Sequence, residues 1–492
     1  MSVRFENPIL YGDYSDPDVI RVGEDFYMIS SSFTYVPGIP VLHSRDLVHW
    51  HLIGYAAEKL PHSRYDRPVH RCGLFAPSLR WHNGLFYVYV CMPDEGLYAF
   101  TAEDPAGKWT CHLVKDVTGW IDPCPLFDED GSVYLVHGFA GSRVGINNLL
   151  YIHRMSPDGL QVLDLGKRVY DGAEHDDDTV EGPKLYRRDG YYFILCPAGG
   201  VTGGYQLALR SRSIYGPYER RVVLSQGNTL VNGPHQGGMV SDGRGGDWFI
   251  HFQDVGVYGR IPHLQPVSWQ NGWPVMGLNG EPVKEGTVPM ESSPCRVADS
   301  DDFAFGPGLQ WQWQCNPRPE WYSPLQPGLR LFACPVPTPF EAGQFLSQMM
   351  QRRDFDMEVT ITPHLLPGGR AGIGVMGYVC HVCLVEEGRV LFIRDTARDR
   401  GHHCFPEVKE EILCTASFTG ETVRMILRVS EGKGRFLFAV QGEKPMPFGE
   451  EFSLSQGGWT GARPGLIALS RNGKTAGYAD FHDVRFSTAA AL

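Results

Sequence analysis

Features that would point to a membrane or nucleic-acid protein are scarce in this sequence of 492 residues. No hydrophobic run approaches the roughly 20 residues that a membrane-spanning helix needs. Basic residues are also outnumbered, because 44 Lys and Arg against 56 Asp and Glu give the chain a net charge of −12. A chain of that sign repels phosphate groups. We therefore expect neither nucleic acid nor a membrane as a partner.

The first 19 residues lack a basic stretch followed by an apolar one, so no signal peptide is predicted. This favours a cytoplasmic location, with a secreted mature chain as the alternative. The 12 cysteines are scattered, which is typical of reduced thiols rather than of a disulfide framework.

One cysteine pair is a candidate zinc site. Cys380 and Cys383 precede His402, His403 and Cys404 in the chain. The segment around the first two alternates as a β-strand does, and residues three apart on a strand face opposite sides. We expect two partly buried strand cysteines rather than a metal centre.

A strong helical period is also absent, whereas 58 Gly, 36 Pro and 12% aromatic residues indicate short strands and many turns. Five segments share one layout, in which a lead residue is followed by Pro or Gly, an apolar strand, a turn and an aromatic strand. The lead residues, spaced about 50–60 positions apart, are Asp16, Ala76, Asp122, Glu181 and His235.

A repeat of this length predicts an all-β fold with a five-bladed β-propeller over residues 1–290, because single blades must stack to bury both faces. Residues 291–300 read as a linker. Alternating strands between 301 and 492 predict a β-sandwich, of the concanavalin-like jelly-roll kind.

Superimposed blades place Asp16, Asp122, Glu181 and His235 at one mouth of the central channel. Carboxylates that converge must separate their pKa values, as acid–base hydrolysis requires. The alternative is that these residues only cap turns, but three acids at matched offsets favour function.

The sequences Asp16-Pro17, Asp122-Pro123 and Glu181-Gly182-Pro183, together with the stretches 73–78, 43–50 and 258–267, resemble glycoside hydrolase family 43. This family comprises β-xylosidases and α-L-arabinofuranosidases. The resemblance implies that Asp16 is the general base, Glu181 the general acid, and Asp122 the residue that orients the acid and tunes its pKa.

The same resemblance implies that Arg260 binds sugar hydroxyls and that Phe33 and Phe75 form an aromatic wall, with Phe75 where many relatives have tryptophan. It places His235 at the propeller axis, as a substrate-binding residue or beside a calcium ion. No cofactor is required, and the structural calcium and a homo-oligomer are left open. In the sandwich, Trp311, Trp313 or Trp321 could bind sugar, although packing against the propeller, with one wall lent to its pocket, is favoured.

These features predict an inverting, exo-acting hydrolase that releases arabinofuranose or xylose from arabinoxylan or xylo-oligosaccharides. The alternatives are a carbohydrate-binding propeller without turnover and an endo-acting arabinanase or xylanase. A retaining fructosidase would need Trp-x-Asn-Asp-Pro-Asn where this chain has Tyr14-Ser15-Asp16-Pro17-Asp18, so that match fails.

Overall fold

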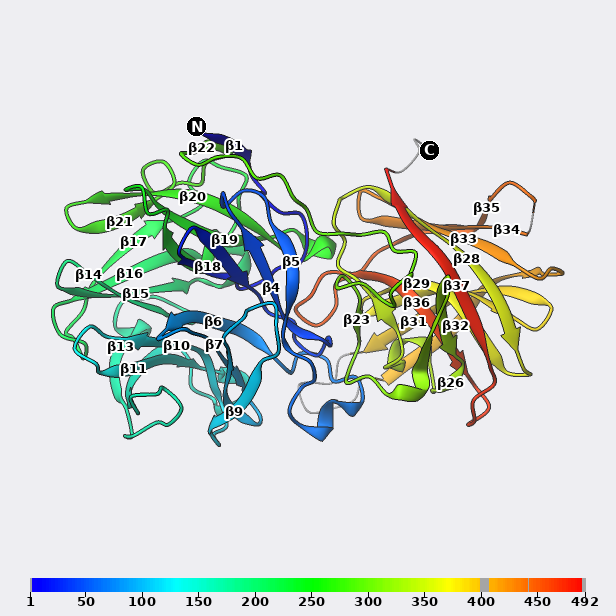
Figure 1. Cartoon of the computed structure of the whole chain (residues 1–492), viewed down its shortest axis with the longest axis horizontal. Helices are drawn as coiled ribbons and strands as arrows, with labels where there is room; N and C mark the ends of the chain where they lie inside the picture. Colours follow the sequence, from blue (N-terminus) through cyan, green and yellow to red (C-terminus); the bar gives the residue numbers. More distant parts are fainter. Residues whose placement is uncertain (1, 399–406, 441, 489–492) are drawn as a thin grey trace.

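The computed structural model describes residues 2–398, 407–440 and 442–488, which form two lobes. In Figure 1 the N-terminal lobe lies on the left and the C-terminal lobe on the right. The N-terminal lobe has five sheets of four antiparallel strands each, which confirms the predicted five-bladed propeller. The strands are β2 (Asp18–Val22), β3 (Asp25–Ile29), β4 (Gly38–Ser44) and β5 (His51–Ala57); β6 (Phe75–His82), β7 (Leu85–Met92), β8 (Gly96–Ala102) and β9 (Thr110–Lys115); β10 (Trp120–Phe127), β11 (Val133–Phe139), β12 (Leu149–Met155) and β13 (Lys167–Asp171); β14 (Lys184–Arg188), β15 (Tyr191–Ala198), β16 (Tyr205–Ser211) and β17 (Glu219–Leu224); and β18 (His235–Ser241), β19 (Asp247–Asp254), β20 (Arg260–Gln270) and β21 (Trp273–Met276).

The blades are held together by apolar clusters that lie between neighbours. Val41 of the first blade packs with Val88 of the second, and Ile250 of the fifth packs with Met28 of the first, which closes the ring. Outside the blades, β1 (Val3–Glu6) pairs with β22 (Glu285–Val288) and ties the beginning of the propeller to its end. Burial of both faces of each blade thus supplies the core that a single sheet lacks.

The propeller is followed by residues 291–300, which contain no helix or strand, and then by two packed antiparallel-rich sheets. These confirm the predicted sandwich. The first sheet contains β23 (Gln312–Trp313), β26 (Cys334–Pro335), β27 (Leu346–Ser347), β29 (Gly369–Met376), β30 (Val379–Glu386), β31 (Arg389–Arg398), β32 (Glu407–Ser417) and β36 (Arg463–Ser470). The second contains β24 (Tyr322–Leu325), β25 (Gly328–Phe332), β28 (Phe355–Leu365), β33 (Val423–Ser430), β34 (Lys433–Val440), β35 (Met446–Ser453) and β37 (Gly477–Ser487).

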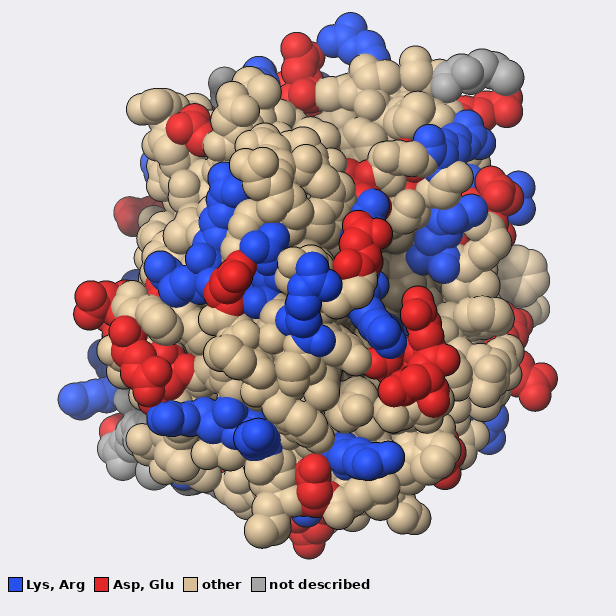
Figure 2. Space-filling model, turned by 90° about the vertical axis from the view of Figure 1, so that its left-hand side faces the viewer, with Lys and Arg blue, Asp and Glu red and all other residues tan. Residues whose placement is uncertain are grey.

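Helices in the described chain are single turns. They are α1 (Gly141–Val144), α2 (Gly200–Gly203), η1 (Ser63–Asp66), η2 (Gly172–Glu174), η3 (Gly256–Tyr258), η4 (Pro319–Trp321) and η5 (Pro339–Glu341). No helix in this part of the chain is long and apolar enough to cross a membrane. Figure 2 shows acidic and basic side chains interspersed over the propeller side of the molecule, so the negative net charge is not gathered into one patch on that face.

Strand β30 confirms that Cys380 and Cys383 face opposite sides. Cys380 packs in one apolar cluster with Phe345, whereas Cys383 packs in another with Phe392. His402, His403 and Cys404 lie outside the described residues. Two thiols on opposite faces of one sheet cannot chelate one ion together.

The suggestion that Trp311, Trp313 or Trp321 binds sugar at the surface of the sandwich is wrong, because all three are buried, at 3%, 6% and 5% exposure. Trp311 donates its indole N–H to Asp301 at 2.9 Å. Trp313 packs against Trp321. Trp311 and Trp313 thus have no free face on which a sugar could stack, and Trp321 lines a cavity between the two lobes rather than the outer surface of the sandwich.

Candidate active site

A cavity of about 430 Å³ lies where the leading ends of the propeller blades meet a loop of the sandwich. Asp16, Asp122 and Glu181 all line it, from the first, third and fourth blades. Arg260, Phe33 and Phe75 line it as well. The fold therefore brings six of the seven predicted site residues into one pocket.

The backbone corrects the register in which the blades were superimposed. In every blade, the residue directly before the Pro or Gly at the start of the innermost strand has a left-handed φ. These residues are Asp16 (54°), Ala76 (48°), Asp122 (56°), Gly182 (54°) and Gln236 (54°). The equivalent positions of the fourth and fifth blades are therefore Gly182 and Gln236, rather than Glu181 and His235. The left-handed residue before Pro or Gly identifies equivalent positions in the blades more reliably than an acidic residue does. The reason is that the backbone conformation repeats from blade to blade, whereas the charge does not.

Glu181 consequently reaches the pocket from one position earlier than the two aspartates, as does Phe75 in the second blade. Its longer side chain starts beside a glycine that takes the left-handed conformation without a Cβ penalty. A Cβ on Gly182 would lie 2.9 Å from the ring of Pro197. Non-glycine residues adopt the same φ at the equivalent positions of the other blades, so it is the close approach of Pro197 that requires glycine at position 182.

Asp16 is buried and held by two donors. The Ser31 hydroxyl donates to Oδ2 at 2.6 Å, and Arg260 donates from Nη1 to Oδ1 at 3.3 Å. Ser31 in turn accepts the backbone N–H of Ala76 at 2.7 Å, which fixes its hydroxyl against the next blade. The two donors together fix the orientation of this carboxylate in the pocket.

The environment of Glu181 favours its protonated form. Burial and the nearby charge of Asp16 raise its pKa from 4.5 to about 7, although the Arg260 charge opposes this. The pKa of Asp122 also lies well above its ordinary value, because of burial and the charge of Glu181. Oδ2 of Asp122 accepts the N–H of Gly182 at 2.7 Å, so this carboxylate contacts the peptide that carries Glu181.

The loop before Glu181 is anchored by Asp177, which belongs to the acidic stretch 174–178 but is only 1% exposed. Its carboxylate accepts hydrogen bonds from Tyr170, from Tyr205 and from Arg220, the last at 2.9 Å and 2.6 Å. Asp177 therefore fixes the path of the chain toward Glu181.

Three aromatic rings form one wall of the pocket. Phe33 and Phe75 are stacked with centroids 5.7 Å apart, and Trp459 of the sandwich contacts both, at 6.2 Å and 5.7 Å. Gly73 allows this arrangement, since it has a φ of 94° and a Cβ there would lie 2.2 Å from the carbonyl oxygen of Phe33. Such rings suit the apolar C–H faces of a sugar.

His235 does not line the pocket; its neighbour Gln236 does. His235 is fully buried, and burial lowers its pKa to about 4. No group of three His, Cys, Asp or Glu among the described residues could hold a metal ion. Since a lone neutral imidazole is a poor calcium ligand, direct coordination of calcium does not fit this position, and an axial ion stays a prediction.

Sequence reasoning missed Trp459, Arg143 and Asn147, which also line the pocket. Arg143 pairs with Asp94 at 3.3 Å and donates to the carbonyl of Arg71 at 3.0 Å. Arg143 and Asn147 lie in the connection between β11 and β12, and Trp459 lies in a loop of the sandwich, so none of them is part of the repeated strand–turn–strand pattern. The one available signal was a tryptophan within the glycine-rich run 457–461, which is typical of an exposed loop.

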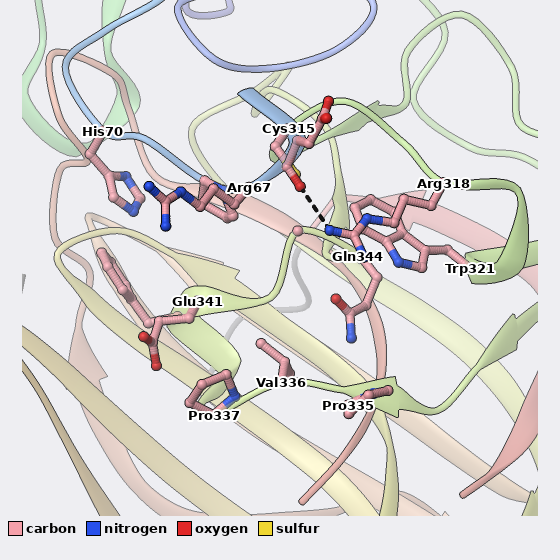
Figure 3. Close-up of a pocket in the computed structure, with 14 residues that line it drawn as sticks. Arg67, His70, Cys315, Arg318, Trp321, Pro335, Val336, Pro337, Glu341 and Gln344 are labelled. Atoms are coloured by element: carbon pink, nitrogen blue, oxygen red, sulfur yellow. Dashed lines mark hydrogen bonds between the residues drawn. The ribbon is translucent and has the colours of Figure 1, made fainter. Parts of the chain in front are cut away.

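A second cavity, of about 350 Å³, lies between the two lobes (Figure 3). Arg67 and His70 enter it from the propeller, and Arg318, Trp321 and Gln344 from the sandwich. Arg318 donates to the carbonyl of Asp66 at 3.3 Å across the interface, the contact drawn in Figure 3. This cavity contains no converging carboxylates like those of the first; its contacts join the two lobes.

Comparisons with known proteins agree with both lobes. The family described as glycosyl hydrolases family 43 matches residues 5–274, and the family described as the beta-xylosidase C-terminal concanavalin A-like domain matches residues 300–487. A putative beta-xylosidase of Xylanibacter ruminicola is 39% identical over 465 residues, covering 92% of this chain and 85% of that protein. A non-reducing end alpha-L-arabinofuranosidase of Bacteroides ovatus is 33% identical over 352 residues, and this match covers 65% of this chain and 63% of that protein.

Among solved structures, the protein described as Bacteroides ovatus xyloglucan PUL GH43B superimposes with a TM-score of 0.83 at 26% identity. The match covers 99% of this chain and 100% of that one, so the two-lobe arrangement is shared as a whole.

Proposed function

Because the chain belongs to family 43 of the glycosyl hydrolases, we propose that it is an inverting, exo-acting enzyme that releases xylose or arabinofuranose from arabinoxylan and xylo-oligosaccharides. The observation that carries this proposal is the convergence of Asp16, Asp122 and Glu181 in one pocket walled by aromatic rings. Relatives named beta-xylosidase and alpha-L-arabinofuranosidase support both sugars.

In the proposed mechanism Asp16 takes a proton from water, which attacks the anomeric carbon on the face opposite the leaving oxygen. Glu181 gives its proton to that oxygen as the glycosidic bond breaks. The hydrogen bonds from Ser31 and Arg260 hold the two carboxylate oxygens of Asp16 in place for this step. The raised pKa of Glu181 favours the protonated form that an acid must be.

Asp122 orients the acid in this scheme through the N–H of Gly182. Burial and the charge of Asp16 raise the pKa of Glu181, and the charge of Glu181 in turn helps to raise the pKa of Asp122. The role proposed for Asp122 is therefore to hold the peptide of Glu181 in place and to tune the pKa of the acid.

Exo action is supported by Trp459, because a ring from the second lobe stands at the pocket beside Phe33 and Phe75. A wall there limits the site to the end of a chain, whereas an endo-acting enzyme needs an open groove. Phe75 offers a smaller ring than tryptophan, so the pocket leaves more space at that side of the sugar.

The test compares wild type, Glu181→Ala and a surface control, Glu103→Ala, on nitrophenyl pentosides and on xylo-oligosaccharides. Glu181→Ala is expected to lower kcat/KM on xylobiose by about 10²- to 10⁴-fold, but less on nitrophenyl substrates, whose leaving group needs little protonation. An equal loss on both would contradict the acid role. NMR of the first-formed sugar should show the inverted anomer, and a retained anomer would overturn the mechanism.

A further inference from the structure

Asp13 is a buried carboxylate, 6% exposed, that the proposed chemistry does not use. It stands three residues before Asp16. Its Oδ1 accepts the backbone N–H of Arg260 at 2.8 Å, and its Oδ2 accepts the backbone N–H of Gly461 at 2.8 Å. One side chain thus joins the segment of the base, the strand that carries Arg260 and a loop of the sandwich.

Glycines stand at both places where the backbone approaches Asp13, namely Gly259 just before Arg260 and Gly461 itself. Gly259 has a φ of 86°, and a Cβ there would lie 2.3 Å from the carboxyl carbon of Asp13. A Cβ on Gly461 would lie 2.8 Å from the backbone nitrogen of Gly259. The backbones of the two lobes therefore approach so closely at Asp13 that only glycine fits on either side.

The loop that contains Gly461 also carries Trp459 into the pocket. A backbone hydrogen bond from Ala462 N to Val257 O at 2.7 Å also joins this loop to the propeller. Trp459 has a left-handed φ of 68°, a conformation that a bulky residue holds only when its surroundings fix it. The Asp13–Gly461 hydrogen bond supplies part of that constraint.

We propose that Asp13 is a positioning residue that couples the sandwich domain to the catalytic centre, by fixing the Trp459 wall and the Arg260–Asp16 pair in one arrangement. The inference rests on the proposed function for its effect on turnover, but the physical link between the lobes does not. Asparagine at this position would turn an N–H donor toward one of the two N–H groups, so one hydrogen bond would be replaced by a repulsive contact.

Asp13→Asn is expected to lower kcat/KM on xylobiose by about 10- to 100-fold, because a small misplacement of positioning groups has effects of that size. Displacement of Arg260 would remove a charge that lowers the pKa of Glu181. The basic limb of the kcat/KM profile should therefore move to higher pH, which a general loss of stability would not produce.

The matched control is Asp46→Asn, which removes another buried carboxylate from the propeller. Asp46 accepts the backbone N–H groups of Val48, His49 and Ser293 at 2.9, 2.7 and 2.8 Å, none of which lines the pocket. We expect this control to keep wild-type kcat/KM. A second variant, Gly461→Ala, disturbs the same contact from the sandwich side and should reproduce the loss if Asp13→Asn folds poorly.

Hydrogen–deuterium exchange separates this inference from the proposed function. Asp13→Asn should increase exchange in residues 256–260 and 457–462 together, whereas Asp46→Asn should leave both segments unchanged. Wild type that hydrolyses no pentoside would refute the proposed function alone. Unchanged exchange in these segments, or kinetic effects of Asp13→Asn that simply add to those of Trp459→Ala, would refute the coupling.

Discussion

Replacement of Glu181 by glutamine should make the protein more stable at neutral and alkaline pH while it removes the catalytic acid. Burial and the charge of Asp16 raise the pKa of this carboxyl from 4.5 to about 7. Since the folded state holds the proton more tightly than the unfolded state does, wild-type stability falls as pH rises from about 4.5 through 7. Glutamine carries no charge, so the variant lacks this loss.

The magnitude follows from the same two pKa values. At about 1.36 kcal/mol for each pKa unit, the difference corresponds to an upper limit of about 3.4 kcal/mol. The side chain is partly accessible from the pocket and its titration is linked to that of Asp122, so we expect about 2–3 kcal/mol above pH 8. The advantage of the variant should shrink steadily as the pH approaches 4.5.

The assay is urea unfolding of wild type and Glu181→Gln at pH 5, 6, 7 and 8. Glu103→Gln, which removes an exposed glutamate, is the control and should show no such trend. A free-energy difference between Glu181→Gln and wild type that stays constant over this pH range would refute the reasoning, whatever its size.

Two further predictions concern the pocket itself. Asp16→Asn should abolish turnover of every substrate, activated or not, because a carboxamide cannot take the proton of the attacking water; turnover of nitrophenyl pentosides near the wild-type rate would exclude Asp16 as the base. Trp459→Ala should raise KM for xylo-oligosaccharides by about 10-fold, as loss of one stacked ring removes about 1–2 kcal/mol of sugar binding, and steady-state kinetics on xylobiose would measure it. An unchanged KM would show that the sandwich contributes no wall.

Much of the catalytic propeller could be predicted from local patterns. A strand, a tight turn and an aromatic strand are short-range features, and their fivefold recurrence implied blades that must stack. The same recurrence placed Asp16 and Asp122 at equivalent positions, which their left-handed φ values bear out. The predicted register is wrong at Glu181 and His235, because the feature that repeats from blade to blade is the left-handed conformation before Pro or Gly, not an acid or an imidazole.

The sequence by itself therefore determined the blade repeat, the all-β architecture and the acids that meet at the blades' leading ends, since each depends on residues close together in the chain. Only the tertiary structure decided which sandwich tryptophan stands at the pocket: Trp459 lines it, whereas Trp311, Trp313 and Trp321 are buried. It also decided that Asp13 bonds to Gly461, 448 positions away. Such contacts depend on how two lobes pack, and no periodic pattern along one chain segment encodes the loop of another.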